Sequence, residues 1–264
     1  MPIFQPPGHI LKITIIIPTY NESGNLPLLA KALFKLPLTN LNLLVVDDNS
    51  TDGTGEIAES LKLTYPGRIG VIHRSGKLGL GSAYITAINQ VLQGDSQVIG
   101  QMDADLSHDP GRIPALVEAL SACDIAVGSR YIRGGAVDSS WPFWRKRLSA
   151  FGNAYARAIL RLPIRDTTGG FRLWRREVLE AMPLERVRSN GYVFLVEMAY
   201  LAHRLGFSFK EVPIYFSERR HGQSKMCLSI QLEAAVRVWS LLWQYKDIKP
   251  IHSTPSTSQT KSQV

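Results

Sequence analysis

Cysteine is scarce in this sequence, and its two cysteines indicate neither a disulfide framework nor a zinc site. Cys123 and Cys227 each lie in an apolar stretch, far from a second cysteine or histidine at metal-ligand spacing. Disulfide-rich secreted domains and zinc modules carry several such residues close together. A reducing, cytosolic site of folding therefore fits the sequence best.

Long apolar runs are also missing. No segment reaches the roughly 18 apolar residues that cross a bilayer, and the first residues do not combine a charged region with a long apolar stretch. We therefore expect neither a signal peptide nor a transmembrane span.

Acidic residues are outnumbered, with 22 aspartates and glutamates against 30 lysines and arginines and a formal net charge of +8. A net positive field attracts nucleic acids, anionic membranes and phosphate-rich substrates alike. No recognition motif and no stripe of alternating aromatic and basic residues supports nucleic-acid binding. We therefore expect no nucleic acid among the partners.

What is present is an alternation of strand and helix patterns. Residues 13–17 (ITIII) and 41–46 (LNLLVV) are continuous and largely aliphatic, as buried parallel strands are, and residues 25–36 between them repeat apolar side chains at helical spacing. The alternation continues to the strand DIAVGSR at residues 124–130. It predicts an α/β fold with a mostly parallel sheet flanked by helices, in which ligands bind at the carboxyl ends of the strands.

Polar residues follow several of these strands. Asp103-Ala104-Asp105 comes directly after the strand VIGQM, and two carboxylates so placed can hold a divalent cation that bridges diphosphate oxygens. Such triplets are also common as solvated turn residues, so the triplet alone is a weak signal. Asp48 in DDNSTDGT suits the base or ribose of a nucleotide, with a helix cap and turn formed by Ser50, Thr51 and Asp52 as the alternative for this run. Lys77 lies in a glycine-rich segment before a helix, a setting that suits phosphate.

In their order, eight segments resemble the inverting family-two glycosyltransferases of the GT-A (Rossmann-like) fold: IIIPTYNE, VVDDNSTDGT, GLGSA, DADLSHDP, GSRYIRGG, TTGGFR, NGYVF and RRHGQSK. The resemblance is greatest to the polyprenol-phosphate (dolichol-phosphate) mannosyltransferase group. It implies an enzyme that transfers a hexose, mannose from GDP-mannose, to polyprenyl phosphate. Transfer of glucose or another sugar from a UDP-sugar, a saccharide acceptor, and an inactive nucleotide-binding module remain alternatives.

The strand-end residues and the resemblance together assign residues to two substrates. The nucleotide-sugar site consists of Pro18, Tyr20, Glu22, Asp48, Lys77, Asp103, Ala104 and Asp105. The resemblance implies that Asp103 and Asp105 bind Mg²⁺ or Mn²⁺. Family members often have glutamine at the position of Ser107, so a third ligand role for this serine stays open. The resemblance implies that Arg145, Ser149, Arg219 and Lys225 bind the acceptor phosphate.

Catalysis is assigned to Asp105, Arg130 and Arg219, with Arg130 expected to face the diphosphate. A lipid phosphate is anionic at neutral pH and can attack the anomeric carbon without a strong general base. Asp105 or Glu197 could assist as a carboxylate, but neither is needed as a base.

The long hydrocarbon chain of such an acceptor requires contact with a bilayer. Residues 226–243 suit an interfacial helix with Trp239 and Trp243 at headgroup level, and a loop with Trp141, Phe143 and Trp144 offers a second contact. Core packing is the alternative for both. We expect a peripheral enzyme on the cytoplasmic side of a membrane, and a separate membrane-anchoring subunit stays an open alternative.

The sequence is thus divided into three parts. They are a GT-A domain over residues 1–228, an interfacial amphipathic helix over 229–248 and a disordered tail over 249–264.

Overall fold

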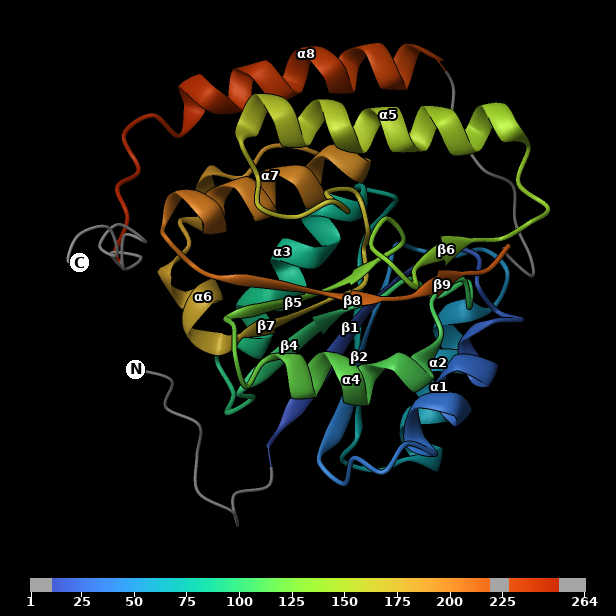
Figure 1. Ribbon diagram of the computed structural model, residues 1–264. Helices are drawn as coiled ribbons and strands as arrows, with labels where there is room; N and C mark the ends of the chain where they lie inside the picture. Colours follow the sequence, from blue (N-terminus) through green and yellow to red (C-terminus); the bar gives the residue numbers. More distant parts are fainter. Residues whose placement is uncertain (1–10, 219–227, 252–264) are drawn as a thin grey trace, which may run out of the picture.

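The computed structural model describes residues 11–218 and 228–251, with the backbone alone for residues 228–234. Figure 1 shows helices layered on both faces of a central sheet. Within the described residues, no helix combines the length and the apolar character that crossing a bilayer requires.

The sheet confirms the predicted α/β fold. Its strands are Ile13–Thr19 (β1), Leu41–Asp47 (β2), Ile69–His73 (β3), Val98–Gln101 (β4), Ile125–Ser129 (β5), Arg172–Arg175 (β7) and Phe209–Pro213 (β8). Among the described residues these seven form one sheet in the order β3-β2-β1-β4-β7-β5-β8. All pairs are parallel except those of β7, which lies antiparallel between β4 and β5. The sequence patterns did not predict this antiparallel strand.

Helices cover both faces of the sheet. They are Leu26–Phe34 (α1), Thr54–Thr64 (α2), Leu80–Val91 (α3), Ile113–Ala119 (α4), Phe143–Leu160 (α5), Arg176–Ala181 (α6), Gly191–Arg204 (α7) and Leu228–Gln244 (α8). One face carries α1, α2 and α4, and the other carries α3, α6 and α7 (Figure 1). Helices α5 and α8 lie side by side as an outer layer over α3 and α7.

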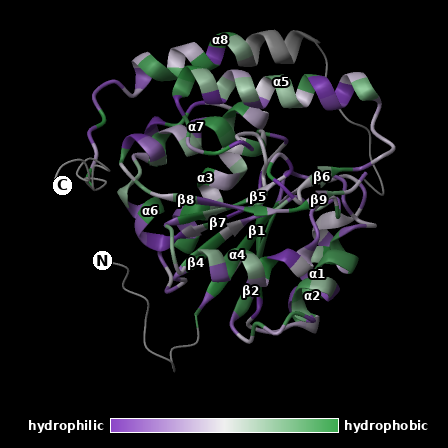
Figure 2. Ribbon diagram, in the orientation of Figure 1, coloured by the Kyte–Doolittle hydropathy of each residue, from purple (hydrophilic) through white to green (hydrophobic). Residues whose placement is uncertain are grey.

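The core has two halves because neighbouring residues of a strand point to opposite faces. Ile15 and Ile17 pack with α1 and α4, whereas Ile16 packs with α3 and α7. All three are fully buried, as expected for a strand covered on both faces. Apolar residues recur along the strands and along α3 and α7 (Figure 2).

A buried carboxylate fastens α8 to the rest of the fold. Glu197 on α7 accepts hydrogen bonds from the Ser189 N–H (2.7 Å), Gln244 Nε2 (2.8 Å) and Tyr245 Oη (2.7 Å). Its side chain is fully buried. Glu197 therefore belongs to the packing of α8, and its suggested part in catalysis stays a prediction.

The outer faces of α5 and α8 are rich in exposed aromatic residues. Phe143, Trp144 and Phe151 on α5 are 70%, 64% and 66% exposed, and Trp239 and Trp243 on α8 are 53% and 73% exposed. We call these five residues the aromatic face. The two helices are linked beneath it, where Trp239 Nε1 donates to Tyr155 Oη at 2.9 Å.

The sequence predicted a loop over residues 141–144, and this prediction is wrong for its second half. Helix α5 already begins at Phe143, so Phe143 and Trp144 are helical. Trp141 is buried and packs edge-on against Phe216, with 5.7 Å between ring centroids. Trp141 therefore packs in the core, which was the alternative to membrane contact, whereas Phe143 and Trp144 are exposed as predicted.

Candidate active site

Three strand ends meet at one edge of the sheet. β1 lies between β2 and β4, with Thr19 paired to Asp47 on β2 and Ile16 paired to Gln101 on β4. Polar loops therefore start side by side after these strands. In open α/β sheets such a reversal of strand order is where ligands bind.

The loops after β1 and β2 form one hydrogen-bonded unit. The Asn21 N–H donates to Ser50 Oγ (2.9 Å), and the Thr51 N–H donates back to Asn21 Oδ1 (3.0 Å). The Glu22 N–H donates to Thr54 Oγ1 at 2.9 Å. Asn21 has a φ of 59°, a left-handed conformation that asparagine adopts more easily than most residues. The backbone next to the predicted nucleotide residues is thus fixed by two loops together.

The three aspartates of DDNSTDGT have separate environments. Asp47 is buried and accepts hydrogen bonds from the turn that follows it. Asp52 accepts from the N–H and hydroxyl of Thr54 (3.1 and 2.5 Å), the first residue of α2, and so belongs to the turn that leads into this helix, whose N-cap is Gly53. Asp48 takes part in neither turn and pairs with Arg74, with Arg74 Nη1 2.5 Å from Asp48 Oδ1.

The predicted nucleotide residues on β1 and on the glycine-rich segment come together. Lys77 Nζ lies 3.7 Å from the centroid of the Tyr20 ring, within cation–π range. Pro18 is partly buried near the end of β1, and Glu22 Oε2 accepts a hydrogen bond from Asn25 Nδ2 at 2.7 Å. The structure thus brings the Lys77 ammonium, the Tyr20 ring and the Glu22 carboxylate to the end of β1.

The turn after β4 carries the two carboxylates. Asp103 is partly exposed, whereas Ala104 and Asp105 are buried. Asp105 Oδ1 accepts hydrogen bonds from the N–H (3.0 Å) and the hydroxyl (2.6 Å) of Ser107. Leu106 between them has a φ of 61°, so the chain turns sharply here. The serine therefore orients Asp105, and its role as a metal ligand stays a prediction.

His108 supports this turn from behind. The Asp103 N–H donates to His108 Nδ1 at 3.3 Å, and the imidazole packs against the rings of Phe171 and Phe216, with centroids 5.1 and 5.2 Å away. Burial lowers the pKa of His108, which favours the neutral ring that can accept this hydrogen bond. His108 is fully buried and acts as a structural hydrogen-bond acceptor.

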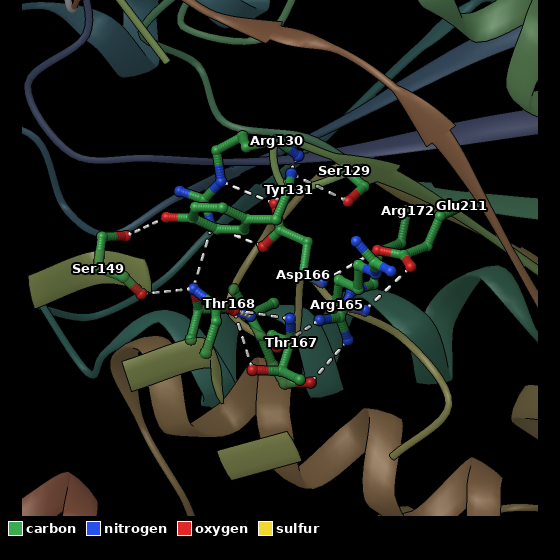
Figure 3. A network of polar contacts seen from close by, with 12 residues as sticks. Ser129, Arg130, Tyr131, Ser149, Arg165, Asp166, Thr167, Thr168, Arg172 and Glu211 are labelled. Carbon is green, nitrogen blue, oxygen red and sulfur yellow. Dashed lines mark hydrogen bonds and ion pairs between the residues drawn. The ribbon is translucent and has the colours of Figure 1, made fainter. Parts of the chain in front are cut away.

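Arg130 lies in a buried ion pair under the neighbouring loop. Its Nε and Nη2 donate to the two oxygens of Asp166 (2.7 and 2.6 Å), and Nη2 also donates to Thr168 Oγ1 at 3.0 Å (Figure 3). Burial opposes ionisation, but Arg130 holds the pKa of Asp166 below its usual value. The guanidinium is thus engaged by the protein, and the expected contact of Arg130 with a diphosphate stays a prediction.

A second buried arginine lies beneath the same loop. Arg172 on β7 is fully buried and donates to the carbonyl oxygens of Leu195 (2.6 Å) and Thr167 (2.7 Å). Burial lowers the pKa of Arg172 to about 10, which still leaves it charged at neutral pH. Two buried cations, Arg130 and Arg172, therefore donate hydrogen bonds to the loop of residues 166–170.

Helix α5 is tied to this loop through Asn153. Asn153 Oδ1 accepts from the N–H groups of Thr167 (2.8 Å) and Thr168 (3.1 Å). One turn earlier, Ser149 Oγ is 2.7 Å from Tyr131 Oη (Figure 3). Ser149, predicted to bind the acceptor phosphate, thus lies within the same hydrogen-bond network as Arg130.

The other predicted acceptor residues are only partly within the described chain. Arg145 lies at the start of α5, with its guanidinium 3.7 Å from the Trp141 ring centroid and 3.5 Å from Glu218 Oε1. Arg219 and Lys225 lie outside the described residues. Because Glu218 directly precedes that segment, Arg145 is adjacent to the point where it begins.

The chemistry of Asp103 and Asp105 fits a hard divalent cation. Carboxylate oxygens are the ligands that Mg²⁺ and Mn²⁺ prefer, and Mg²⁺ commonly uses one or two of them together with substrate phosphates and water. Over residues 11–218 and 228–251, no group of three or more histidines, cysteines and acidic residues is arranged to hold a metal.

Sequence reasoning missed several residues that shape the site. Arg74, Asp166 and Arg172 each bind a partner more than twenty residues away in sequence, namely Asp48, Arg130 and Leu195, and no spacing rule connects them. Arg172 did carry one usable signal, since an arginine within the apolar strand RLW requires buried partners. Asn153 carried a similar one, as a polar residue on the inner side of an amphipathic helix.

Comparison with known proteins gives consistent matches. Residues 14–182 match the family described as "Glycosyl transferase family 2". The chain is 45% identical over 225 residues to a polyprenol monophosphomannose synthase of Mycolicibacterium smegmatis, covering 85% of this chain and 84% of that protein. It is 40% identical over 241 residues to an undecaprenyl-phosphate mannosyltransferase of Micrococcus luteus, covering 90% and 98% of the two chains.

Solved structures share the fold at low sequence identity. A glucosyl-3-phosphoglycerate synthase of Mycobacterium tuberculosis, in complex with Mg²⁺ and UDP, matches with a TM-score of 0.61 at 19% identity, covering 91% of this chain and 81% of that one. A complex of the same enzyme with Mn²⁺, UDP and glucosyl-3-phosphoglycerate matches with a TM-score of 0.59 at 18% identity, covering 91% and 82% of the two chains. These likenesses support a GT-A-like fold.

Proposed function

The chain belongs to glycosyl transferase family 2, and from this premise we propose that it transfers mannose from GDP-mannose to a polyprenyl phosphate. The observation that carries the proposal is the Asp103-Ala104-Asp105 turn at the carboxyl end of β4, in a chain that aligns over most of its length with two polyprenyl-phosphate mannosyltransferases. A UDP-sugar donor or a saccharide acceptor is the second candidate.

The donor would bind across the ends of β1, β2 and β4. The carboxylate of Asp48 can accept hydrogen bonds from the base or ribose, and the Tyr20 ring offers an apolar face with Lys77 beside it. Asp103 and Asp105 would hold Mg²⁺ or Mn²⁺, which when bound supplies positive charge to the departing diphosphate. The hydrogen bonds of Ser107 to Asp105 fix the turn that carries these two carboxylates.

The acceptor phosphate would bind between the start of α5 and the segment after Glu218. Arg145 and Ser149 lie on this helix, and guanidinium groups suit phosphate because they donate to it in a fork. Arg219 and Lys225 complete the proposed set from outside the described residues. With an anionic oxygen as the nucleophile, the residues mainly hold it in line with the anomeric carbon and need not remove a proton. Attack from the face opposite the diphosphate inverts the anomeric centre.

The lipid would be reached by docking on a membrane surface. The aromatic face is formed by exposed side chains of α5 and α8, and Trp and Phe rings partition favourably into the headgroup region. Helix α5 also carries four basic residues and no acidic ones, Arg145, Lys146, Arg147 and Arg157, which favours anionic lipid. A bilayer-docked chain needs no anchoring subunit, although such a subunit remains compatible with this face.

A donor panel tests the proposal directly. The purified chain is incubated with MgCl₂, a polyprenyl phosphate and radiolabelled GDP-mannose, UDP-glucose or other nucleotide sugars, and the lipid is extracted. We expect label in the lipid only with GDP-mannose, and no label when the unphosphorylated polyprenol replaces the phosphate. Labelling from a UDP-sugar alone would replace the donor assignment, and a lipid fraction without label from any donor would contradict the function.

A further inference from the structure

A buried ion pair lies at the edge of the donor site. Arg74 directly follows β3, and its Nη1 is 2.5 Å from Asp48 Oδ1. The two side chains are only 7% and 9% exposed. An ion pair shielded in this way is screened little by salt and holds its geometry more firmly than a surface pair.

The same guanidinium also reaches the glycine-rich segment and the following helix. Its Nη2 donates to Ser82 Oγ (2.6 Å) in the first turn of α3, and its Nη1 lies 3.4 Å from the Gly79 carbonyl oxygen. The Arg74 N–H donates to the Asp47 carbonyl oxygen at 2.9 Å, which fixes the start of the side chain. Arg74 therefore connects the end of β2, the segment that carries Lys77 and the start of α3.

The pairing of β2 with β3 is complete without the Arg74 side chain. The strands β2 and β3 are already paired over five residues that end at Asp47 and His73, before Arg74 is reached. What Arg74 fixes is the direction of the Asp48 carboxylate beyond the end of the strand. One oxygen of Asp48 is occupied, and no described residue donates a hydrogen bond to the other.

We propose that Arg74 is a positioning residue for nucleotide recognition, which orients Asp48 and the Lys77 segment around the nucleoside of the donor. It touches neither the sugar nor the phosphates, and it acts through Asp48. An ionised carboxylate only accepts hydrogen bonds, so a fixed Asp48 favours a nucleoside that offers N–H or O–H donors in one direction. This inference rests on the proposed function, because it assigns Asp48 to the nucleoside.

A double-mutant cycle on GDP binding tests the proposal. GDP with MgCl₂ is titrated calorimetrically into the full chain and into Arg74→Met, Asp48→Asn and the double variant. We expect Arg74→Met to weaken GDP about tenfold, within the usual range of couplings between neighbouring residues. In the Asp48→Asn background the same change should cost little, because the carboxylate that Arg74 orients is already gone.

Two further variants separate positioning from general stability. Arg68→Met is the matched control, since Arg68 just precedes β3 and donates to the Leu41 carbonyl oxygen at the opposite end of the strands. It should lower the melting temperature without changing the affinity for GDP. Arg74→Lys keeps the charge but lacks the fork that reaches Asp48 and Ser82 together, so its loss should be intermediate. If Arg74→Met does not fold, the cycle is run with Arg74→Lys.

The outcomes distinguish this inference from the proposed function. Equal GDP affinity in Arg74→Met and the unaltered chain would overturn the positioning role, as would fully additive losses in the double variant. An unaltered chain that binds no nucleoside diphosphate would contradict the proposed function and the inference with it. Lipid labelling by the unaltered chain, together with unchanged GDP affinity in Arg74→Met, would remove the inference alone.

Discussion

The carboxylate of Asp105 is fixed by hydrogen bonds within its own turn. The N–H and hydroxyl of Ser107 both donate to one of its oxygens, and the side chain is 5% exposed. A carboxylate fixed in this way loses little conformational freedom when it binds a ligand. Its charge should therefore matter more than its volume.

Replacing that charge is the first prediction. Asp105→Asn should keep the fold and lower kcat about a hundredfold or more, because a neutral amide would hold the divalent cation that stabilises the leaving diphosphate more weakly than a carboxylate does. Activity is followed as mannose transfer to lipid across a range of MgCl₂ and MnCl₂ concentrations. Asp109→Asn is the control, since Asp109 is exposed and caps the short 3₁₀-helix at Pro110–Arg112. Asp105→Asn with an unchanged metal dependence would place the cation elsewhere.

For individual residues, the sequence predicted which residue types lie at the strand ends, but not which partners they bind. Tyr20 and Lys77 meet beyond the end of β1. Asp103 and Asp105 follow β4, the strand next to β1, because strand direction brings these ends to one edge of the sheet. Arg130 was expected to face a diphosphate, and the structure pairs it with Asp166, far along the chain. A guanidinium binds carboxylate and phosphate with the same fork, so the sequence alone cannot select between them.

Helix α5 presents different residues on its two faces. Its inner side presents Ser149 and Asn153, four residues apart and so on one face, to the loops of the site. Its outer side carries Phe143, Trp144 and Phe151. The helix thus connects the predicted acceptor residues directly to the proposed membrane contact.

Removing the outer aromatic residues is the second prediction. The double variant Trp144→Ser with Phe151→Ser should bind liposomes of anionic lipid about tenfold more weakly or worse, because two large apolar side chains no longer leave water. Co-sedimentation with vesicles gives the bound fraction. Leu63→Ser on α2 is the control, as Leu63 is 83% exposed and helix α2 lies on the face of the sheet opposite α5 (Figure 1).

Two results would count against this assignment. Equal vesicle binding by the double variant would show that the aromatic face does not dock. A loss of binding in Leu63→Ser of the same size would show that exposure alone, and not the position on α5, determines it.

Acid should destabilise the whole molecule over a defined range. Burial works in the opposite direction, but hydrogen bonds from Thr54 and Ser23 hold the pKa of Asp52 at about 2, against 3.8 in an unfolded chain. The pKa of Asp138 and that of Asp247 are also lowered to about 2, chiefly by hydrogen bonds from nearby backbone and side-chain groups. Folded pKa values below the unfolded ones stabilise the protein above pH about 4, and this contribution is lost as the pH falls toward 2.

Urea unfolding at several pH values measures this effect. The free energy of unfolding should change little from these three groups above pH about 4 and then fall steadily toward pH about 2. Asp52→Asn should reduce the slope of that fall, because the variant has no carboxylate to protonate at this position. The same slope in Asp52→Asn and in the unaltered chain would show that Asp52 does not contribute.

The strands from β1 to β5 could be predicted from the sequence, whereas β7 could not. The strands up to β5 follow simple aliphatic patterns separated by helices, and the structure places them close to the predicted residues. β7 reads RLWR, with two charged residues in four, and it is buried because Arg172 finds carbonyl partners on α7 and the loop before the strand. Such pairing depends on the finished fold, so a local pattern could not indicate it.

The strand order also has a consequence for synthesis on the ribosome. β1 and β2 pair at once, whereas both neighbours of β5 in the finished sheet, β7 and β8, lie later in the chain. A nascent chain ending between β5 and β7 therefore exposes one open edge on β4 and leaves β5 without partners. Open edges pair readily with other chains. We therefore expect the nascent chain to aggregate most readily, and to need a chaperone most, if translation pauses between β5 and β7.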